Sequence, residues 1–338
     1  MEDRYSRQQL FSPIGEKGQE LIRKKHVLLV GVGALGCVSA EAVVRAGIGT
    51  ITLIDRDYVE WSNLQRQQLF CERDAQLKLP KVIAAKKRLT QINSDVNIHA
   101  HMMDAGAVNM EPLLKGVDVI IDATDNFDSR FILNDLSQKF NIPWIYGSCV
   151  GSFGLCYTII PQQSPCLQCV LKQHPLVNAT CDTAGVIGPI VQMIASYQVA
   201  ETLKILVEDF SALNKALIAI DLWNNQHYSM NMNKSKDEAC PSCGNQPTYP
   251  SLNYDSQTKT AVLCGRNTVQ IRHAHHQYFD LEKLERKLLL QGTVQRNPYL
   301  VSCQFNECRV VFFQDGRVFV HGTDDILTAK NIFYQILG

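Results

Sequence analysis

Val-Leu-Leu-Val-Gly-Val-Gly-Ala-Leu-Gly, at residues 27–36, is an apolar strand that runs directly into a G-x-G-x-x-G turn. Its glycines are Gly31, Gly33 and Gly36, and such glycines let the backbone approach a phosphate group at the amino terminus of the next helix. A second apolar strand ends at Asp55, where an acidic side chain can bind ribose hydroxyls. The segment predicts a nucleotide-binding βαβ unit, with a tight turn that binds no ligand as the alternative.

Strands and helices alternate from residue 27 to residue 147, which predicts a doubly wound, Rossmann-like parallel sheet with its ligand outside the carboxyl ends of the strands. The pattern then changes to antiparallel strands and one long apolar helix, at residues 150–160, 216–221, 226–232 and 186–208. The predicted fold class is therefore α/β, with a mostly parallel sheet that continues into antiparallel strands.

The composition shifts again after residue 244. Residues 310–313 and 317–320 have the pattern of two strands, and the Gln-Asp-Gly segment between them is a hairpin signal. We predict a nucleotide-binding domain over residues 1–244 and a small α+β domain of unknown role over residues 245–338.

Length, charge and cysteine content narrow the class of protein. With 338 residues the chain is long enough for more than one domain. Lys and Arg number 33, as do Asp and Glu, so the net charge favours neither nucleic acid nor an anionic membrane as a partner. No signal peptide or membrane-length apolar run is present, so we expect a soluble, cytoplasmic protein. Twelve cysteines in such a protein indicate metal ligation, catalysis or burial rather than disulfides.

Polar and cationic side chains follow the second strand, where a triphosphate rather than a nicotinamide would need them. They are Asn63, Arg66, Gln67 and Lys81. A lone Arg or Lys is usually a solvated surface charge. Together, after a nucleotide-binding strand, they favour a clamp that neutralises the α-phosphate of ATP. Asp55 remains the expected ribose ligand because it directly ends the strand, although Asp57 is an alternative.

A further apolar strand leads into the run Asp122-Ala123-Thr124-Asp125-Asn126. These side chains lie where a magnesium ion that bridges the phosphates would be held. We expect Asp125 to be the ligand, with Asn126 beside it in the nucleotide site. Asp122 is the alternative, although it can instead serve as a capping or packing acid.

Two C-x-x-C pairs occur far apart in the chain, Cys166 with Cys169 and Cys240 with Cys243. Tetrahedral zinc needs four thiolates in two such knuckles, so we predict a structural zinc site that ties distant segments together. Two unrelated pairs of buried cysteines, or a redox C-x-x-C, are the alternatives.

Cys181 lies in a loop of small residues immediately before the long helix. A helix amino terminus and nearby cations can lower the pKa of a thiol, which suits a nucleophile or a sulfur carrier. A small buried residue in a loop is the alternative reading.

Taken in order, these motifs resemble the MoeB/ThiF adenylyltransferases, relatives of the ubiquitin-activating enzymes. The resemblance covers about residues 4–244 and includes the Arg4-Tyr5-Ser6-Arg7-Gln8 segment, the glycine turn, the Asn63–Gln67 segment, Lys81, Thr124-Asp125-Asn126, both cysteine pairs and the Cys181 loop. It implies ATP-dependent adenylation of the C-terminal glycine of a small ubiquitin-like sulfur-carrier protein, with release of pyrophosphate. Short members end near the second cysteine pair, and the longer eukaryotic relatives carry a sulfurtransferase domain that this tail does not resemble.

The resemblance also implies roles and partners. Arg7 would reach the ATP site of a neighbouring subunit, so a homodimer is expected. Asp55 would hold the ribose, Arg66 and Lys81 the phosphates, and Asp125 the magnesium. Cys181 matches a cysteine that can form a covalent sulfur link with the carrier in the thiamine branch. A Gly-Gly carrier and a sulfur donor such as a cysteine desulfurase are the implied partners.

Several functions remain open at this stage. The carrier can serve molybdopterin, thiamine thiazole or tRNA thiolation, or the enzyme can activate another modifier. A nicotinamide dehydrogenase would need neither Arg66 nor Lys81 nor the zinc. A catalytically inactive docking protein is a further possibility, against which the intact set Arg7, Arg66, Lys81 and Asp125 argues.

Overall fold

The computed structural model describes residues 4–173, 184–253, 260–263, 267–271 and 278–337. The chain divides into two compact units. The first consists of Met1–Gln76, Pro80–Ala179 and Gly185–Asp255, and the second of Leu77–Leu79, Thr180–Ala184 and Ser256–Gly338.

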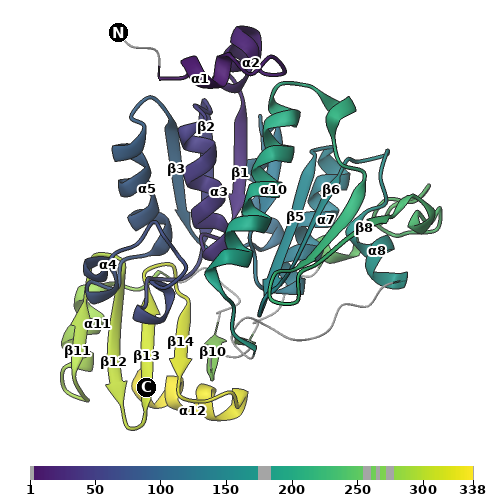
Figure 1. Cartoon of the computed structure of the whole chain (residues 1–338). Helices are drawn as coiled ribbons and strands as arrows, with labels where there is room; N and C mark the ends of the chain where they lie inside the picture. The colour runs from purple at the N-terminus through teal and green to yellow at the C-terminus, as the bar shows by residue number, and fades with distance from the viewer. Residues whose placement is uncertain (1–3, 174–183, 254–259, 264–266, 272–277, 338) are drawn as a thin grey trace. The chain divides into compact units, whose positions relative to one another are not determined.

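The first unit is built on an eight-stranded sheet with the strand order β3-β2-β1-β4-β5-β6-β7-β8 (Figure 1). In this spatial order, neighbouring strands from β3 through β2, β1 and β4 to β5 pair in parallel, and those from β5 to β8 pair antiparallel. The strands are β1 His26–Val30, β2 Thr50–Asp55, β3 Asn97–Met102, β4 Val119–Asp122, β5 Trp144–Val150, β6 Phe153–Ile159, β7 Ala216–Asp221 and β8 Gln226–Asn231. This sheet confirms the predicted fold class, including the change from parallel to antiparallel pairing.

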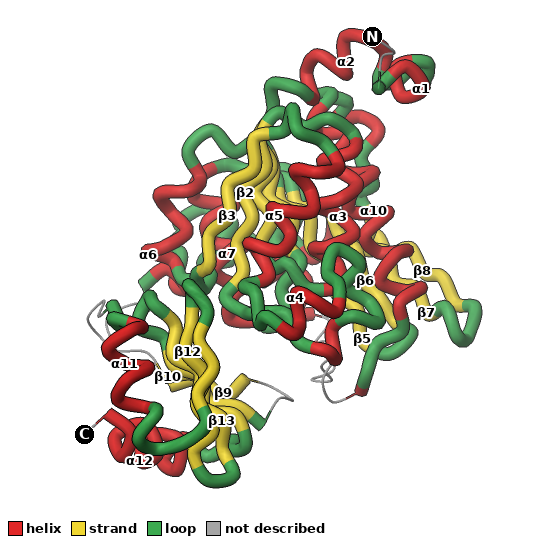
Figure 2. The backbone as a smooth tube through the Cα atoms, turned by 90° about the vertical axis from the view of Figure 1, so that its left-hand side faces the viewer, coloured by secondary structure: helices red, strands yellow, loops and turns green. Residues whose placement is uncertain are grey.

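Helices cover both faces of this sheet (Figures 1 and 2). Helices α3 (Ala34–Arg45), α5 (Lys81–Ile92) and α10 (Gly188–Leu206) lie on one face, and α7 (Phe127–Phe140) lies on the other. Because both faces are covered, the central strands are apolar without alternation, and Val27, Leu28 and Leu29 are fully buried.

The remaining helices that the structure describes in this unit are short. They are α1 Ser6–Gln9, α2 Gly15–Ile22, α4 Glu72–Gln76, α6 Ala107–Met110 and α8 Leu167–Gln173, with 3-10 helices η1 Trp61–Asn63, η2 Glu111–Leu114, η3 Phe210–Ala212, η4 Asn233–Ser235 and η5 Pro250–Leu252. The main apolar core on the α7 side includes Leu28, Ile120, Leu133, Trp144 and Tyr157.

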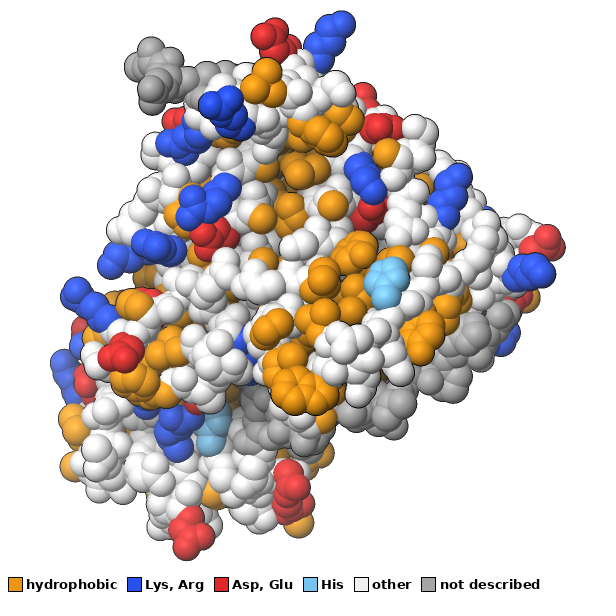
Figure 3. Space-filling view, viewed as in Figure 1, with side chains coloured by type: hydrophobic (Ala, Val, Ile, Leu, Met, Phe, Trp, Pro, Cys, Tyr) orange, Lys and Arg blue, Asp and Glu red, His pale blue; other side chains and the backbone are white. Residues whose placement is uncertain are grey.

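Apolar side chains also gather on the outer surface of α10 and of β6 to β8 (Figure 3). They include Phe153, Met193, Trp223, Tyr228 and Met230, all of which are exposed, Trp223 to 76%. We call these five residues the α10 surface.

In the described residues, the second unit contains a six-stranded antiparallel sheet and the helices α11 and α12. Its strand order is β11-β12-β13-β14-β10-β9. The elements are β9 Thr260–Leu263, β10 Thr268–Ile271, α11 Leu281–Leu288, β11 Val294–Arg296, β12 Leu300–Phe305, β13 Cys308–Phe313, β14 Val318–His321 and α12 Ile326–Leu337. Strands β13 and β14 form the hairpin expected from the sequence. Val310, Phe312 and Val320 pack with Leu284 and Phe333 of the helices, which gives this unit an apolar core of its own.

Within the part of the chain that the structure describes, no helix has both the length and the hydropathy of a membrane span.

Candidate active site

The predicted nucleotide ligands come from the carboxyl ends of three neighbouring strands. Strand β1 leads into the glycine turn, β2 ends at Asp55, and β4 ends at Asp122, with β1 paired to both of the other strands. Ligands of open α/β sheets bind outside this edge. The topology therefore brings together segments that are up to about ninety residues apart in sequence.

The three glycines of the turn differ in the space that a side chain would find at each position. A Cβ at Gly31 would lie 2.4 Å from the carbonyl oxygen of Ala123, and one at Gly36 would lie 1.9 Å from that of Gly31. A Cβ at Gly33 would meet only Gln67 Nε2, at 4.0 Å. Gly31 and Gly36 are therefore required by packing, whereas Gly33 leaves open space at the amino terminus of α3. Because no side chain caps this helix, its first backbone N–H groups suit a phosphate in that space.

Asp55 is tied to the glycine turn by hydrogen bonds. Its Oδ2 accepts from Val32 N at 2.7 Å, and its Oδ1 accepts from Asp57 N at 2.7 Å. A carboxylate has about four lone-pair positions, so both oxygens retain capacity for ribose hydroxyls. Burial raises the pKa of Asp55, and the positive charge of Lys81 opposes that shift.

Lys81 begins α5 and is 3% exposed. Its Nζ lies 3.3 Å from Oδ2 of Asp57, which is itself buried. The two acids that follow β2 are thus distinguished by the fold, since Asp57 pairs with Lys81 while Asp55 binds the glycine turn. This supports Asp55 rather than Asp57 as the ribose ligand. The positive charge of Lys81 lies close to both.

The segment that contains Arg66 and Gln67 is shaped by Asn63. The Asn63 side chain accepts from Glu60 N at 2.9 Å as part of a capping box around η1, and the Asn63 carbonyl accepts from Gln67 N at 2.9 Å. Gln67 is buried, and among the described residues its Oε1 has no hydrogen-bond partner. Arg66 is partly buried and donates to the carbonyl of Ser62 at 2.9 Å. Asn63 therefore positions this turn, and Arg66 and Gln67 are the side chains available to a ligand.

The carboxylates after β4 also differ in environment. Asp122 is fully buried, and its Oδ1 accepts from Thr124 N at 2.9 Å and from Thr124 Oγ1 at 2.7 Å. Burial raises the pKa of Asp122, which the Arg130 guanidinium opposes. Asp125 is exposed. Asn126 caps α7, since its Oδ1 accepts from Ser129 N at 2.8 Å, and its amide donates to Asp125 Oδ1 at 3.3 Å. Asp122 is thus enclosed by the turn that follows β4, whereas Asp125 is exposed at the surface.

Arg130, which the sequence reasoning did not single out, lies against the turn that holds Asp125. It is 5% exposed, its Nε lies 3.6 Å from Asp122 Oδ2, and its Nη2 donates to the carbonyl of Thr124 at 2.7 Å. The guanidinium also lies over the rings of Phe127 and Tyr146, at 5.3 and 5.2 Å from their centroids. Its position one turn into the helix after Asp125 is the only sequence signal that points to it.

Helix α1, which contains Arg7, lies at the opposite edge of the sheet from the amino terminus of α3 (Figure 1). Gln8 of the same helix donates to Gln19 Oε1 at 2.6 Å and to the carbonyl of Ala46 at 3.0 Å, beyond the carboxyl end of α3. The twelve residues of α3 span about 18 Å, which separates this anchor from the phosphate turn. The exposed Arg7 side chain therefore does not join the site of its own chain.

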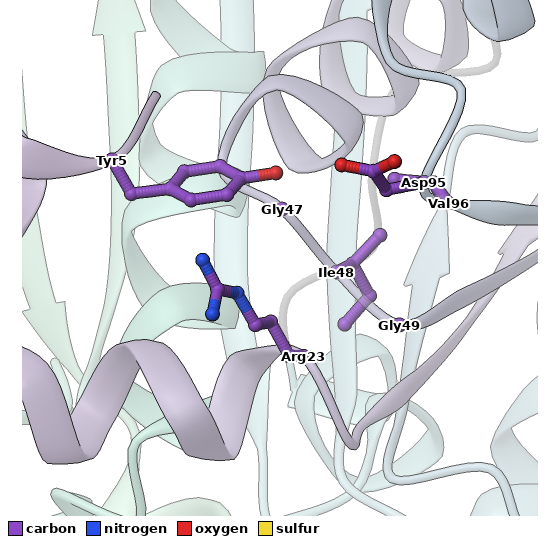
Figure 4. A pocket seen from close by; sticks show the side chains of 7 residues that line it. All are labelled: Tyr5, Arg23, Gly47, Ile48, Gly49, Asp95 and Val96. Carbon is purple, nitrogen blue, oxygen red and sulfur yellow. The ribbon is translucent and has the colours of Figure 1, made fainter. Parts of the chain in front are cut away.

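A small cavity of about 210 Å³ lies beside this anchor, between Tyr5, Arg23 and Asp95 (Figure 4). The Arg23 guanidinium lies over the Tyr5 ring at 5.0 Å, and the Tyr5 hydroxyl accepts from Asn93 Nδ2 at 2.8 Å. A Cβ at Gly47 would come within 2.5 Å of the ring. The cavity is smaller than a typical ligand pocket and belongs to the packing that holds α1 in place.

The four predicted metal ligands form one cluster. The Sγ atoms of Cys166 and Cys240 are 3.6 Å apart, those of Cys169 and Cys243 are 3.5 Å apart, and all four lie within 4.8 Å of one another. Zn–S bonds of about 2.3 Å in a tetrahedron place the sulfurs about 3.8 Å apart. The cluster can therefore bind a metal ion such as zinc, with all four positions taken by protein. Cys181 lies outside the described residues.

Comparison with known proteins agrees with this geometry. The ThiF family model matches residues 5–242. The chain is 48% identical, over the whole of both proteins, to a sulfur carrier protein ThiS adenylyltransferase of Bacillus subtilis. It is 31% identical to a sulfur carrier protein adenylyltransferase of Thermus thermophilus, over 74% of this chain and 93% of the relative.

The fold is also found in a solved structure, that of Escherichia coli MccB with ATP. The TM-score is 0.60 with 23% sequence identity, over 72% of this chain and 74% of MccB. The strand order, the glycine turn, the four-cysteine cluster and these similarities lead to one assignment: the chain belongs to the ThiF family of adenylyltransferases.

Proposed function

We propose that this enzyme uses ATP to adenylate the C-terminal glycine of a small ubiquitin-like sulfur-carrier protein of the ThiS type, in thiamine thiazole biosynthesis. The observation that carries the proposal is the similarity to the Bacillus subtilis ThiS adenylyltransferase, because it extends over all of both chains. It therefore includes residues 245–338, which we propose as a separate domain. A carrier for molybdopterin or tRNA thiolation is the alternative.

The reaction joins a carboxylate to the α-phosphorus of ATP. A carboxylate oxygen of the carrier's terminal glycine attacks the α-phosphorus, the bond from that phosphorus to the bridging oxygen breaks, and pyrophosphate leaves with the electron pair. The carboxyl group is already ionised at neutral pH, so the enzyme needs no strong base. Catalysis is then mostly positioning and neutralisation of charge.

The residues at the carboxyl edge suit these tasks. The amino terminus of α3, with the open space at Gly33, would receive the phosphates, and Asp55 would hold the ribose. Arg66 and Lys81 would neutralise the charge that grows on the phosphate oxygens, and Gln67 would orient them. Asp125, with Asn126 beside it, would hold Mg²⁺, which neutralises the phosphates and the leaving pyrophosphate.

Arg7 is proposed to complete the site of a partner subunit. The anchor of its helix α1 at Ala46, about the length of α3 from the turn, supports a role in a neighbouring chain rather than in its own. The α10 surface lies on the sheet face that α3 also covers, and its exposed apolar groups are suited to burial in a two-fold interface. In such a homodimer each chain would supply Arg7 to its neighbour.

Sulfur transfer to the activated carrier is the step that would follow. We propose Cys181 as the residue that can link covalently to the carrier through sulfur, with a cysteine desulfurase or another donor as the source. A Cys181→Ser variant is expected to keep adenylation and lose thiolation of the carrier.

The test of the proposed activity is ATP–pyrophosphate exchange by the purified full-length chain. It is measured with each Gly-Gly carrier from the same genome, and with an Asp125→Ala variant. Exchange with the ThiS-type carrier alone, reduced at least about a hundredfold in the variant, is the expected result. Exchange with a different carrier would redirect the proposal to that pathway. No exchange with any carrier would favour an inactive docking protein.

A further inference from the structure

Helix α7 contacts two sites that are separate in function. Near its amino terminus the buried Arg130 faces the turn that holds Asp125. One turn further along, Asn134 and Asp135 are both fully buried, and their side chains face the segments that hold the four cysteines. The proposed nucleotide site does not use these two residues.

Arg130 restrains the backbone directly before Asp125. Its Nη2 donates to the carbonyl of Thr124 at 2.7 Å, and its guanidinium lies over two aromatic rings and beside Asp122. A planar guanidinium fixed on several sides has little freedom to move. A displacement of α7 would therefore be transmitted to the Thr124–Asp125 peptide.

Asn134 and Asp135 bind one cysteine knuckle each. Asn134 Oδ1 accepts from Leu167 N at 2.8 Å, next to Cys166 in the first knuckle. Asp135 Oδ1 lies 2.5 Å from the hydroxyl of Ser242, which is between the two cysteines of the second knuckle. Asp135 Oδ2 accepts from Ser251 N at 2.8 Å, just beyond that knuckle.

These contacts hold the backbone and side chains beside the cysteines, and so orient the four thiol groups. A fully buried carboxylate is costly unless its oxygens accept hydrogen bonds, so Asp135 holds Ser242 and Ser251 firmly. Residues that orient metal ligands in this way typically change metal affinity by 10- to 100-fold when they are replaced.

We propose that α7 couples the four-cysteine cluster to the nucleotide site, with Asn134 and Asp135 as positioning residues of the two knuckles and Arg130 as the positioning residue of the Asp125 turn. Metal binding locks both knuckles onto α7 and so keeps Asp125 in place. Coupling between two binding sites is reciprocal in affinity, so bound ATP must also tighten the binding of metal, which we expect to see as slower loss of metal. The ATP part of this inference rests on the proposed function, whereas the knuckle part does not.

The knuckle part is tested by the rate of zinc release. The zinc-loaded full-length chain is mixed with a chromogenic chelator, and its release rate is compared with those of Asp135→Asn and Ser242→Ala variants. Both variants are expected to release zinc at least about tenfold faster. Asp128→Asn is the matched control, because Asp128 is an exposed acid in the first turn of the same helix. It is expected to leave the rate unchanged.

Ser242→Ala removes a single hydroxyl, so it keeps the test valid if Asp135→Asn fails to fold. Cobalt in place of zinc gives a second readout, since the absorption of a tetrahedral tetrathiolate site reports its geometry. Equal release rates and spectra for the wild type, Ser242→Ala and Asp128→Asn would overturn the assignment of the knuckle contacts.

The coupling is tested by repeating the zinc-release measurement with saturating ATP. ATP is expected to slow release from the wild type at least about fivefold, and to have no effect in Arg130→Lys, which keeps the charge but loses the planar contact with Thr124. Calorimetry on the same samples measures ATP binding. If ATP binds without slowing zinc release and without raising the zinc affinity measured at equilibrium against the chelator, the coupling is wrong. If ATP does not bind, the proposed function fails and the coupling fails with it, while the knuckle assignment still depends on the release rates alone.

Discussion

The buried cation Lys81 acts electrostatically on two neighbouring acids, Asp55 and Asp57. Its Nζ lies 3.3 Å from Asp57, and its charge lowers the pKa of Asp55, which burial raises. Asp55 must be ionised to accept hydrogen bonds from a ribose through both oxygens. The electrostatic role of Lys81 thus extends beyond any direct contact with a phosphate.

A Lys81→Met variant is expected to bind ATP at least about tenfold more weakly at neutral pH, because a charge-assisted contact is lost. Without the opposing charge, burial raises the pKa of Asp55 further, so the carboxyl takes up its proton at a higher pH. We call the fall in ATP affinity on acidification the acid limb of ATP binding. Measured by calorimetry between pH 5 and pH 8, this acid limb should therefore move to higher pH.

Lys81→Arg is the control for this shift, since it keeps the positive charge and should keep the acid limb of the wild type. If the acid limbs of the wild type and of Lys81→Met coincide, Lys81 does not shift the pKa of Asp55.

At the scale of elements, the turn between β1 and α3 contains, within six residues, glycines that close packing requires and one that leaves open space. Gly36 approaches the carbonyl of Gly31 so closely that a Cβ would lie 1.9 Å from its oxygen. Gly33, at the N-cap of α3, meets no such obstacle. Packing therefore requires glycine at residue 36 and does not require it at residue 33.

Gly36→Ala is expected to lower the free energy of unfolding by at least about 1–3 kcal/mol, because backbone must move to admit the methyl group. Gly33→Ala should lose much less stability but bind ATP about tenfold more weakly, since the methyl group enters the space for a phosphate. Thermal unfolding and calorimetry on both variants check the pair. The interpretation fails if Gly33→Ala binds ATP as the wild type does.

At the scale of the whole molecule, the separation of Arg7 from the carboxyl edge determines how the site can be complete. The contacts of Gln8 with Gln19 and Ala46 hold α1 at the amino-terminal edge of the sheet. A site that uses Arg7 must therefore be shared between two chains.

This sharing is tested by mixing two inactive variants, Arg7→Ala and Asp125→Ala. If Arg7 acts in the partner's site, each mixed dimer has one intact site, and random exchange of subunits restores about a quarter of wild-type pyrophosphate exchange. Each variant measured alone is the control. No recovery, with mixed dimers demonstrated by differently tagged chains, would show that Arg7 does not act in the partner's site.

Spacing along the chain was enough to predict the features whose chemistry is local. The glycine turn, the acid that ends the next strand and the two C-x-x-C pairs lie in short motifs, and the alternation of strand and helix predicted the α/β class that the structure confirms. The change to antiparallel strands after Gly147 was predicted for the same reason, because the pattern of apolar residues changes with the pairing.

Only the tertiary structure decided which side chains meet across the fold. It paired Asp122 with Arg130 and Asp57 with Lys81, placed α1 at the far edge, and set Asn134 and Asp135 against the two cysteine knuckles. Arg130 and Asp135 are ordinary helix residues in the sequence, and their partners are up to 116 residues away. Such contacts depend on how helices pack on a sheet rather than on local spacing, so no motif records them.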